Sequence, residues 1–110
     1  MASTDRYTHP GPERAEIDAL HGATLLEFGT DWCGHCQAAR APIAEALQAR
    51  GSHSLRHLKV EDGSGRALGR SFRVKLWPTL VFLKDGVEVA RLVRPADSAA
   101  IGQALDAIGA

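Results

Sequence analysis

Short apolar runs and helix-spaced apolar stripes alternate along the chain. Residues 24–28, Thr-Leu-Leu-Glu-Phe, predict a buried strand that one acidic residue interrupts. After Cys36 the apolar residues recur at helical spacing as far as Gly51, which predicts a long helix. Pro42 lies inside this helix, and because its ring removes a backbone hydrogen bond and opposes the carbonyl of Ala38, we expect a kink there.

The C-terminal part of the chain predicts a hairpin followed by a helix. Residues 79–83 and 87–93 flank Asp85-Gly86, a dipeptide that favours a tight turn, so these two segments should pair antiparallel. Asp97 is a good N-cap for a last helix. The apolar stripe of that helix consists of Ile101, Ala104, Leu105 and Ile108.

The remaining segments complete the order helix, strand, helix, strand, short helix, hairpin, helix. We expect a short helix over residues 12–22, a second strand over residues 55–61 and a weak helix over residues 63–72. A strand-helix-strand unit followed by a hairpin implies an α/β fold, with a mixed central β-sheet and helices on both faces. Residues 1–11 have little to bury and should form a flexible lead-in to a single domain over residues 12–110.

Composition and charge limit the partners that the chain can have. At 110 residues and 45% hydrophobic content, the chain is large enough to bury one core, and we expect a monomer. Its 13 basic and 13 acidic residues cancel, which favours neither nucleic acid nor a membrane surface as a partner. Residues 1–14 lack the apolar core of a secretory signal, and no later run reaches membrane-spanning length, so we expect a cytoplasmic protein.

Both cysteines of the chain lie in the tetrad Cys33-Gly34-His35-Cys36, which follows Trp32 at the start of the predicted long helix. Two cysteines at this spacing can close a small disulfide ring reversibly. The N–H groups and the positive dipole end of a helix N-terminus favour the thiolate at the first sulfur. We therefore expect thiol chemistry, in which an exposed Cys33 is the nucleophile and a partly covered Cys36 resolves the mixed disulfide.

Three segments follow one another at compatible spacing along the chain. They are Leu25-Leu26-Glu27-Phe28, Trp32-Cys33-Gly34-His35-Cys36 and Trp77-Pro78-Thr79. Together they resemble the thioredoxin family across roughly residues 13–109. The resemblance implies the thioredoxin fold and a thiol-disulfide oxidoreductase acting on protein disulfides or thiols. It also implies no cofactor beyond the Cys33-Cys36 disulfide, and a reductant such as a thioredoxin-reductase-like enzyme or glutathione.

The Gly34-His35 pair, together with glutamate at position 27, looks like the catalytic domains of protein disulfide isomerases, whereas thioredoxins usually carry Gly-Pro. Those isomerases act in a secretory lumen, whereas this sequence shows neither a secretory signal nor a retention sequence, so we still expect a cytosolic reductase that serves cell redox homeostasis. When protonated, His35 should stabilise the Cys33 thiolate, unless it is merely a solvated turn residue. If His35 stabilises the reduced form by about 1 to 2 kcal/mol, the reduction potential of the Cys33-Cys36 pair becomes roughly 20 to 45 mV more oxidising than the value of about −270 mV established for thioredoxin itself.

The resemblance also implies roles for residues outside the tetrad. Glu27 matches the family's buried carboxylate that helps to move the proton of Cys36, and burial should raise its pKa. Lys59 matches the lysine beside that carboxylate; for both residues a solvent-facing strand position is the alternative. Trp32 would pack beside the redox centre. Pro78 matches the cis-proline whose loop faces the cysteines and receives an extended substrate.

Three positions depart from the family pattern. Trp77 stands where the family has an aliphatic or small residue; it would enlarge the apolar contact surface, and a structural core tryptophan is an equal alternative. Arg94 stands where thioredoxins have a glycine that leaves room for substrate. Pro42 follows Cys36 by six residues rather than five. Trp77 and Arg94 together indicate a substrate-binding surface suited to one dedicated partner.

Two other functions are compatible with the tetrad. A zinc site would use Cys33, His35 and Cys36, but tetrahedral zinc takes four ligands, normally from two separated pairs. No second pair exists, and the other histidines are scattered as His9, His21, His53 and His57, so we expect no metal. The second alternative is a redox-inactive binding or chaperone module that keeps the fold, against which the intact cysteine pair argues.

Overall fold

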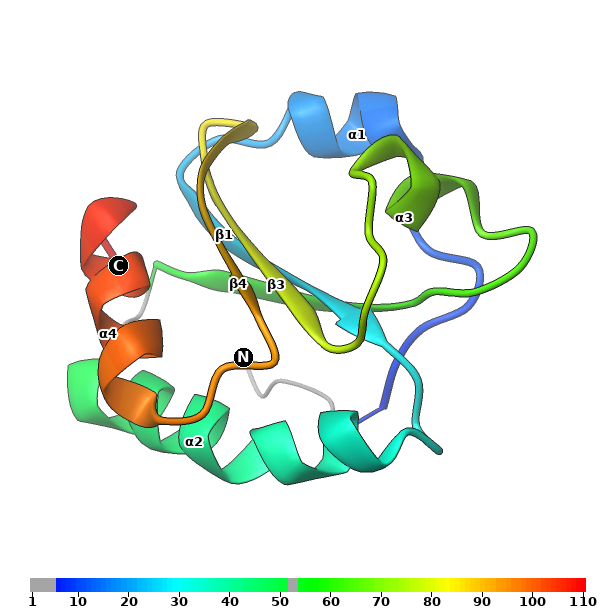
Figure 1. The fold of residues 1–110 in the computed structure, drawn as a ribbon. Coiled ribbons are helices and arrows are strands. Elements are labelled where there is room, and N and C mark those ends of the chain that lie inside the picture. The colour runs from blue at the N-terminus through cyan, green and yellow to red at the C-terminus, as the bar shows by residue number, and fades with distance from the viewer. Residues whose placement is uncertain (1–5, 52–53) are drawn as a thin grey trace.

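The computed structural model describes residues 6–51 and 54–110, and within these residues four strands form one mixed sheet (Figure 1). The strands are β1 (Ala23–Gly29), β2 (Arg56–Glu61), β3 (Thr79–Lys84) and β4 (Val87–Val93). Their order across the sheet is β2-β1-β3-β4, where β1 and β2 are parallel and the other neighbours are antiparallel. The mixed sheet predicted from the sequence is confirmed.

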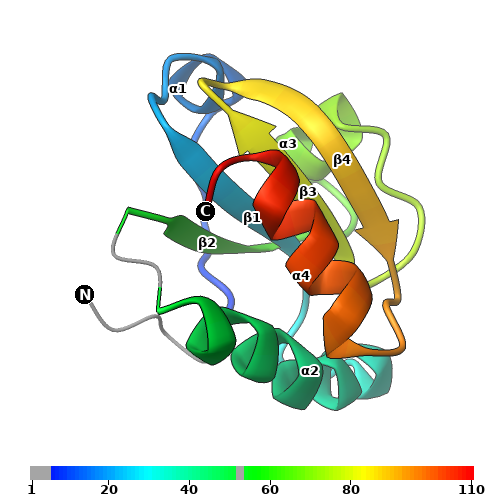
Figure 2. The same cartoon turned by 90° about the vertical axis from the view of Figure 1, so that its left-hand side faces the viewer.

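Helices cover both faces of this sheet (Figure 2). They are α1 (Arg14–Asp18), α2 (Gly34–Arg50), α3 (Ala67–Ser71) and α4 (Ser98–Ala107). The apolar side chains of α2 and α4 pack on one face and those of α1 and α3 on the other. Helices α1 and α3 are shorter than the sequence predicts. Among the residues that the structure describes, no helix is long and apolar enough to cross a membrane.

Strand β1 lies inside the sheet and is buried along its whole length. Successive side chains of a strand point to opposite faces. Leu25 accordingly joins the apolar cluster under α2 and α4, whereas Leu26 and Phe28 join the cluster under α1 and α3. Glu27 has the same parity as Leu25, so the pleat directs the one acidic residue of this strand toward the helix that carries the cysteines.

Local sequence signals set several element boundaries. Asp85 and Gly86 have φ angles of 52° and 79°, which are those of the tight hairpin turn expected there. Asp97 caps α4, because its Oδ1 accepts a hydrogen bond from the Ala100 N–H at 3.0 Å. Both predictions are confirmed. Helix α2 runs from Gly34 to Arg50 with Pro42 inside it, so the proline does not end the helix.

Residues 6–11 are not the flexible lead-in that the sequence predicts; residues 1–5 of that segment lie outside the described residues. Thr8 forms a parallel bridge to the edge strand β2, in which its N–H donates to the Lys59 carbonyl at 2.9 Å. Tyr7 is buried, with 9% of its surface exposed. The expectation was wrong because the edge strand offers unpaired backbone groups to this segment, and the buried Tyr7 side chain anchors it further.

Candidate active site

The two cysteines lie where the chain passes from β1 into α2. Cys33 is the N-cap of the helix, with an extended backbone (φ −79°, ψ 125°), and its carbonyl accepts the Gln37 N–H at 3.0 Å. Gly34 begins the helix and Cys36 follows within its first turn. Both cysteines are free. The N–H groups of the first turn are therefore available to the Cys33 sulfur.

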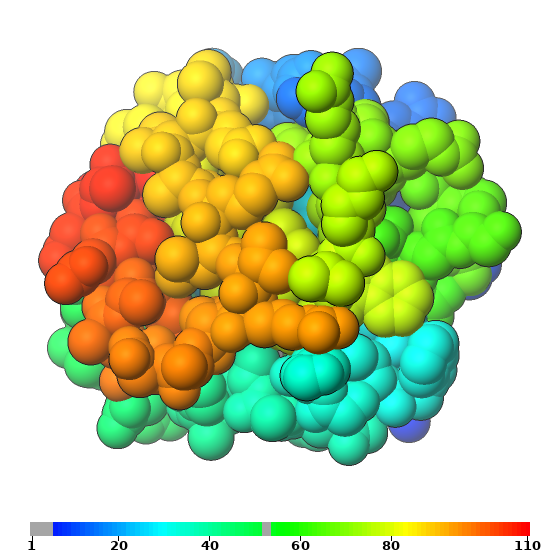
Figure 3. Space-filling view, in the orientation of Figure 1, coloured from blue at the N-terminus to red at the C-terminus, as the bar shows by residue number. Residues whose placement is uncertain are grey.

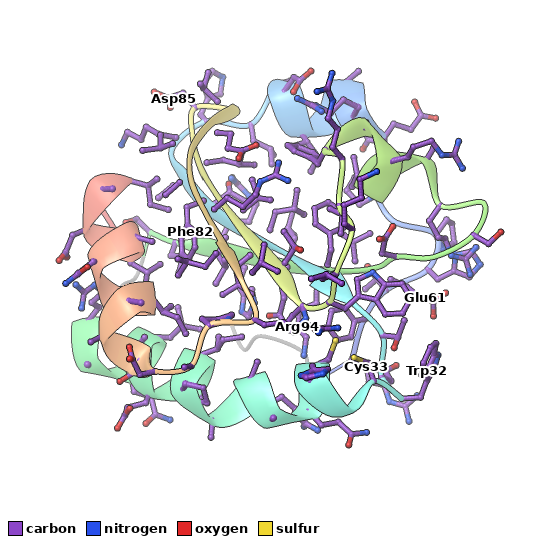
Figure 4. All side chains as sticks on the ribbon, in the orientation of Figure 1. Trp32, Cys33, Glu61, Phe82, Asp85 and Arg94 are labelled. Atoms are coloured by element: carbon purple, nitrogen blue, oxygen red, sulfur yellow. The ribbon has the colours of Figure 1, made fainter. Side chains whose placement is uncertain are left out.

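Cys33 is the more accessible of the two cysteines, but it is less exposed than the sequence predicts. Only 8% of its surface is exposed, because the half-buried Trp77 packs against the cysteine cluster. Burial raises the pKa of Cys33, yet hydrogen bonds from Cys36 and from the His35 N–H outweigh it. The positive charge of Arg94 acts in the same direction, so the net pKa of Cys33 is lowered. Figure 4 shows Arg94 beside Cys33 at this end of the molecule.

Cys36 lies deeper, with 2% of its surface exposed, and its surroundings have the opposite effect. Burial raises the pKa of Cys36 to about 11, although a hydrogen bond from the Thr30 N–H opposes the rise. The side chain of Cys33 contributes to this net rise, whereas a hydrogen bond with the Tyr7 hydroxyl opposes it. Cys36 therefore holds its proton more firmly than Cys33 does.

Glu27 lies beneath the cysteines, with 1% of its side chain exposed. Its Oε2 accepts a hydrogen bond from the Tyr7 hydroxyl at 2.5 Å, and its Oε1 is 2.9 Å from His57 Nε2. Burial raises the pKa of Glu27, as predicted, but the hydrogen bonds from His57 and Tyr7 outweigh burial. The charges of His57 and Lys59 add to their effect. The net pKa of Glu27 is therefore lowered, and the predicted rise is wrong because the partners of this carboxylate come from other segments.

Lys59 is buried beside this carboxylate, and the strand register places it directly opposite Glu27. Its Nζ lies 4.5 Å from the centroid of the Tyr7 ring, which is within cation–π distance. The solvent-facing alternatives for Lys59 and Glu27 are thereby excluded. One lysine, one carboxylate and one phenol share a buried space next to Cys36.

Tyr7 and His57 are the residues of this site that the sequence analysis missed. A signal for Tyr7 was available, because it is the only tyrosine of the chain and interrupts a polar segment. A signal for His57 was also present: it precedes Lys59 by two residues, and in a strand this spacing puts both side chains on one face. Neither signal becomes informative until the pairing of β1 with β2 is known.

The loop before β3 forms the upper wall of the site. The peptide bond between Trp77 and Pro78 is cis, as the resemblance implied. The indole Nε1 of Trp77 donates to Asp62 Oδ2 at 2.9 Å, and its ring packs against the cysteine cluster. Trp77 is thus half-buried: it covers the redox centre and keeps some accessible surface.

Trp32 and Arg94 flank Cys33 on opposite sides in Figure 4. Trp32 is 73% exposed, and its ring makes a T-shaped contact with Trp77 at 5.7 Å between centroids. Arg94 has a positive φ of 51°, and its Nε donates to the Trp77 carbonyl at 2.8 Å. Figure 3 shows the segments around residues 77 and 94 meeting the start of α2 on one face.

A groove of about 560 Å³ opens between α2 and residues 94–98. The exposed His35 lines it together with Pro42 and Arg94. Within the described residues, no three His, Cys, Asp or Glu side chains are grouped so that they could hold a metal ion. The structure thus brings every site residue singled out in the sequence to one end of the sheet.

The chain is similar to known proteins over most of its length. The thioredoxin family model matches residues 14–107. Thioredoxin from Chlamydia trachomatis is 39% identical over 72 residues, which cover 66% of this chain and 69% of that protein. Protein disulfide-isomerase from Oryctolagus cuniculus is 39% identical over 75 residues, but the match spans only 14% of its length.

Solved structures agree with these sequence matches. Thioredoxin 2 from Pseudomonas aeruginosa PAO1, in its reduced form, is 55% identical with a TM-score of 0.83, and 96% of each chain is covered. A mutant thioredoxin from Halobacterium salinarum NRC-1 is 26% identical with a TM-score of 0.71, covering 98% of this chain and 95% of that one. The thioredoxins found by sequence and those found by structure therefore point to the same family.

Proposed function

Because this chain belongs to the thioredoxin family and is a thiol-disulfide oxidoreductase, we propose that its two cysteines divide the reaction between them. Cys33 attacks a protein disulfide, and Cys36 resolves the mixed disulfide that results. The observation that carries this assignment is the contrast between the two sulfurs: the pKa of Cys33 is lowered, whereas that of Cys36 is raised to about 11. The thiolate is the nucleophile in disulfide exchange, so the sulfur that ionises more readily attacks first.

The reaction needs two exchanges at sulfur. In the first, the Cys33 thiolate attacks one sulfur of the substrate disulfide, whose S–S bond breaks, and the other substrate sulfur leaves as a thiolate. In the second, Cys36 loses its proton and attacks Cys33. The bond between Cys33 and the substrate breaks, the electron pair passes to the substrate sulfur, and the Cys33-Cys36 disulfide remains. The cysteine pair thereby supplies both electrons.

We assign the neighbouring residues by their contacts. Glu27 accepts the proton that leaves Cys36, and the buried Lys59 compensates its charge. Gly34 leaves the N-terminus of α2 open, because nothing lies within 4 Å of the place where a Cβ would stand. His35 tunes Cys33, with its backbone N–H as the contact that supports the role.

The substrate lies across the rim of the site. Trp32 and Trp77 provide an apolar contact next to Cys33, and the cis bond before Pro78 shapes the loop that an extended substrate segment meets. Arg94 holds the Trp77 carbonyl and presents a positive charge to the substrate. This combination of an aromatic pair with an arginine supports selection of a narrow set of protein substrates.

In the cell, the protein works as a cytoplasmic reductase within one domain. Its electrons come from a thioredoxin-reductase-like enzyme or from glutathione. The balanced charge and the presence of only two cysteines, both in the tetrad, support this setting.

Trapping of mixed disulfides tests the proposal. The Cys36→Ser variant should accumulate covalent adducts with protein substrates that reducing agent releases, because the first exchange proceeds and the second cannot. The matched variant Cys33→Ser should accumulate none. Adducts at Cys36 in the Cys33→Ser variant that equal those at Cys33 would reverse the assignment, and the absence of adducts from both variants would refute it.

A further inference from the structure

Tyr7 stands between the resolving cysteine and the buried carboxylate. Its hydroxyl donates to Glu27 Oε2 at 2.5 Å, and its side chain packs in one cluster with Cys36. The end of β1 confirms how close these groups are: a Cβ at Gly29 would stand 2.5 Å from Cys36 Sγ and 2.8 Å from Tyr7 Oη. The Cys36 sulfur and the Tyr7 oxygen therefore lie on the same side of Gly29, and the Glu27 carboxylate lies on the far side of the Tyr7 oxygen.

The segment that carries Tyr7 is held on both sides. Its backbone N–H donates to Asp31 Oδ1 at 3.0 Å, and the next residue, Thr8, donates through N–H and Oγ1 to the Lys59 carbonyl at 2.9 and 2.8 Å. Lys59 Nζ lies over the phenol ring. The hydroxyl is thus fixed in position by contacts that do not depend on the cysteines.

We propose that the Tyr7 hydroxyl carries the proton between Cys36 and Glu27 during disulfide exchange. This rests on the proposed function, in which Cys36 is the resolving thiol. It adds to that function a catalytic residue from the N-terminal segment, which contacts the reacting sulfur directly.

The transfer balances as two coupled steps. As Cys36 attacks, its S–H bond breaks and the proton binds to Tyr7 Oη, while the original phenol proton moves to Glu27 Oε2. Tyr7 ends as a neutral phenol beside the Cys36 sulfur, which now forms the disulfide with Cys33, and Glu27 ends protonated. Glu27 then releases this proton, because its pKa is lowered; when the disulfide is reduced again, Glu27 takes up a proton and the transfers run in reverse, so that Cys36 regains its thiol.

The charges around Tyr7 suit a hydroxyl that passes protons without becoming ionised. Burial, followed by the negative charge of Glu27 and the hydrogen bond to it, raises the pKa of Tyr7. The lowered pKa of Glu27 keeps this carboxylate ionised at neutral pH, so that its oxygen is free to take the proton transiently, and a proton taken up there is readily released again. The titratable and charged groups that face Tyr7 from the surrounding elements are Glu27, Asp31, Cys36, Arg40 and Lys59, with His57 behind the carboxylate.

Reaction with 5,5′-dithiobis(2-nitrobenzoate) separates the two cysteines. Attack by Cys33 releases the first thionitrobenzoate, and resolution by Cys36 releases the second, so two kinetic phases report the two sulfurs. In Tyr7→Phe the ring remains and the hydroxyl is lost. We expect the first phase to be unchanged and the second to slow at least tenfold at neutral pH, given that positioned proton transfer contributes about 10² to 10⁴. Raising the pH should restore the second phase as Cys36 ionises unaided.

Ser71→Ala is the control, because it removes a hydroxyl from α3, on the face of the sheet opposite to the helix that carries the cysteines; both of its phases should match wild type. Glu27→Gln, which leaves Tyr7 in place, should slow the second phase as Tyr7→Phe does, and the double variant should be no slower than the slower single variant. Proton transfer through Tyr7 would be overturned if the second phase of Tyr7→Phe were as fast as that of wild type. It would also be overturned if the effects of the two substitutions on the rate of the second phase were fully additive in the double variant. Loss of both phases from the wild-type protein would instead refute the proposed function itself.

Discussion

The two sulfur atoms of this protein stand three positions apart in one helix turn, yet their surroundings differ in almost every respect. Cys33 lies at the helix end, near backbone N–H groups and Arg94, and its pKa is lowered. Cys36 lies on the buried side of the first turn of α2, against Tyr7 and the end of β1, and its pKa is raised to about 11. The contrast shows that two cysteines close together in sequence can be given opposite tendencies to ionise. Cys33 ionises readily at the helix end, whereas the buried Cys36 keeps its proton until it reacts.

The Cys36 side is packed more tightly than the Cys33 side, and Gly29→Ala should disturb that packing. The new Cβ would stand 2.5 Å from Cys36 Sγ and 2.8 Å from Tyr7 Oη, so both groups must shift. We expect a loss of about 1 to 3 kcal/mol in the free energy of unfolding, measured in urea, together with a slower resolving step. Gly34→Ala is the control on the Cys33 side, where space is open. Equal stability of the two variants would contradict this account.

The buried carboxylate should make the Cys36 side sensitive to acid. Because the pKa of Glu27 is lowered from 4.5 in the folded state, its contribution to stability is complete above that value and is lost as the pH falls through the folded pKa. Glu27→Gln should cost about 1 kcal/mol at neutral pH, and the difference from wild type should shrink below pH 4.5. Urea unfolding of both proteins, measured from neutral pH to below pH 4.5, checks this difference in the free energy of unfolding. The exposed Glu45→Gln should show no such trend; a constant difference for Glu27→Gln would contradict the assignment.

The charge of Arg94 should affect the ionisation of Cys33 but not that of Cys36. Arg94→Gln removes a positive charge that favours the thiolate, so the pKa of Cys33 should rise. Alkylation of Cys33 by iodoacetamide at neutral pH should slow about two- to fivefold, as expected for one exposed charge. Arg91→Gln is the control, since Arg91 pairs with Glu88. An alkylation rate unaffected by Arg94→Gln would show that the helix N-terminus alone activates Cys33.

Trp32 should matter for substrates and hardly at all for folding. The side chain is 73% exposed, so Trp32→Ala should change the free energy of unfolding by less than about 0.5 kcal/mol. The KM for a protein disulfide should nevertheless rise, because the aromatic contact beside Cys33 is lost. Val87→Ala, at the distant hairpin, removes another exposed apolar side chain and should leave both quantities unchanged. A KM equal to that of wild type would place substrate binding elsewhere on the rim.

The elements that follow from local pattern were predictable. The hairpin turn at Asp85-Gly86 and the cap at Asp97 depend on backbone preferences of single residues, and both are present. The cysteine spacing and the helix that follows it are likewise local, so the position of Cys33 as N-cap could be expected. The contacts of Glu27 could not be, because Tyr7, His57 and Lys59 reach it from distant segments.

The sequence by itself determined the order of elements and the thiol chemistry, because periodicity, turn residues and a two-residue cysteine spacing act over short distances. Only the tertiary structure decided how the two sulfurs differ. Pairing of β1 with β2 and docking of residues 6–11 on the sheet edge bring charges and a phenol to Cys36. A pKa depends on what surrounds a group in space, and neighbours in space are set by packing of the whole chain.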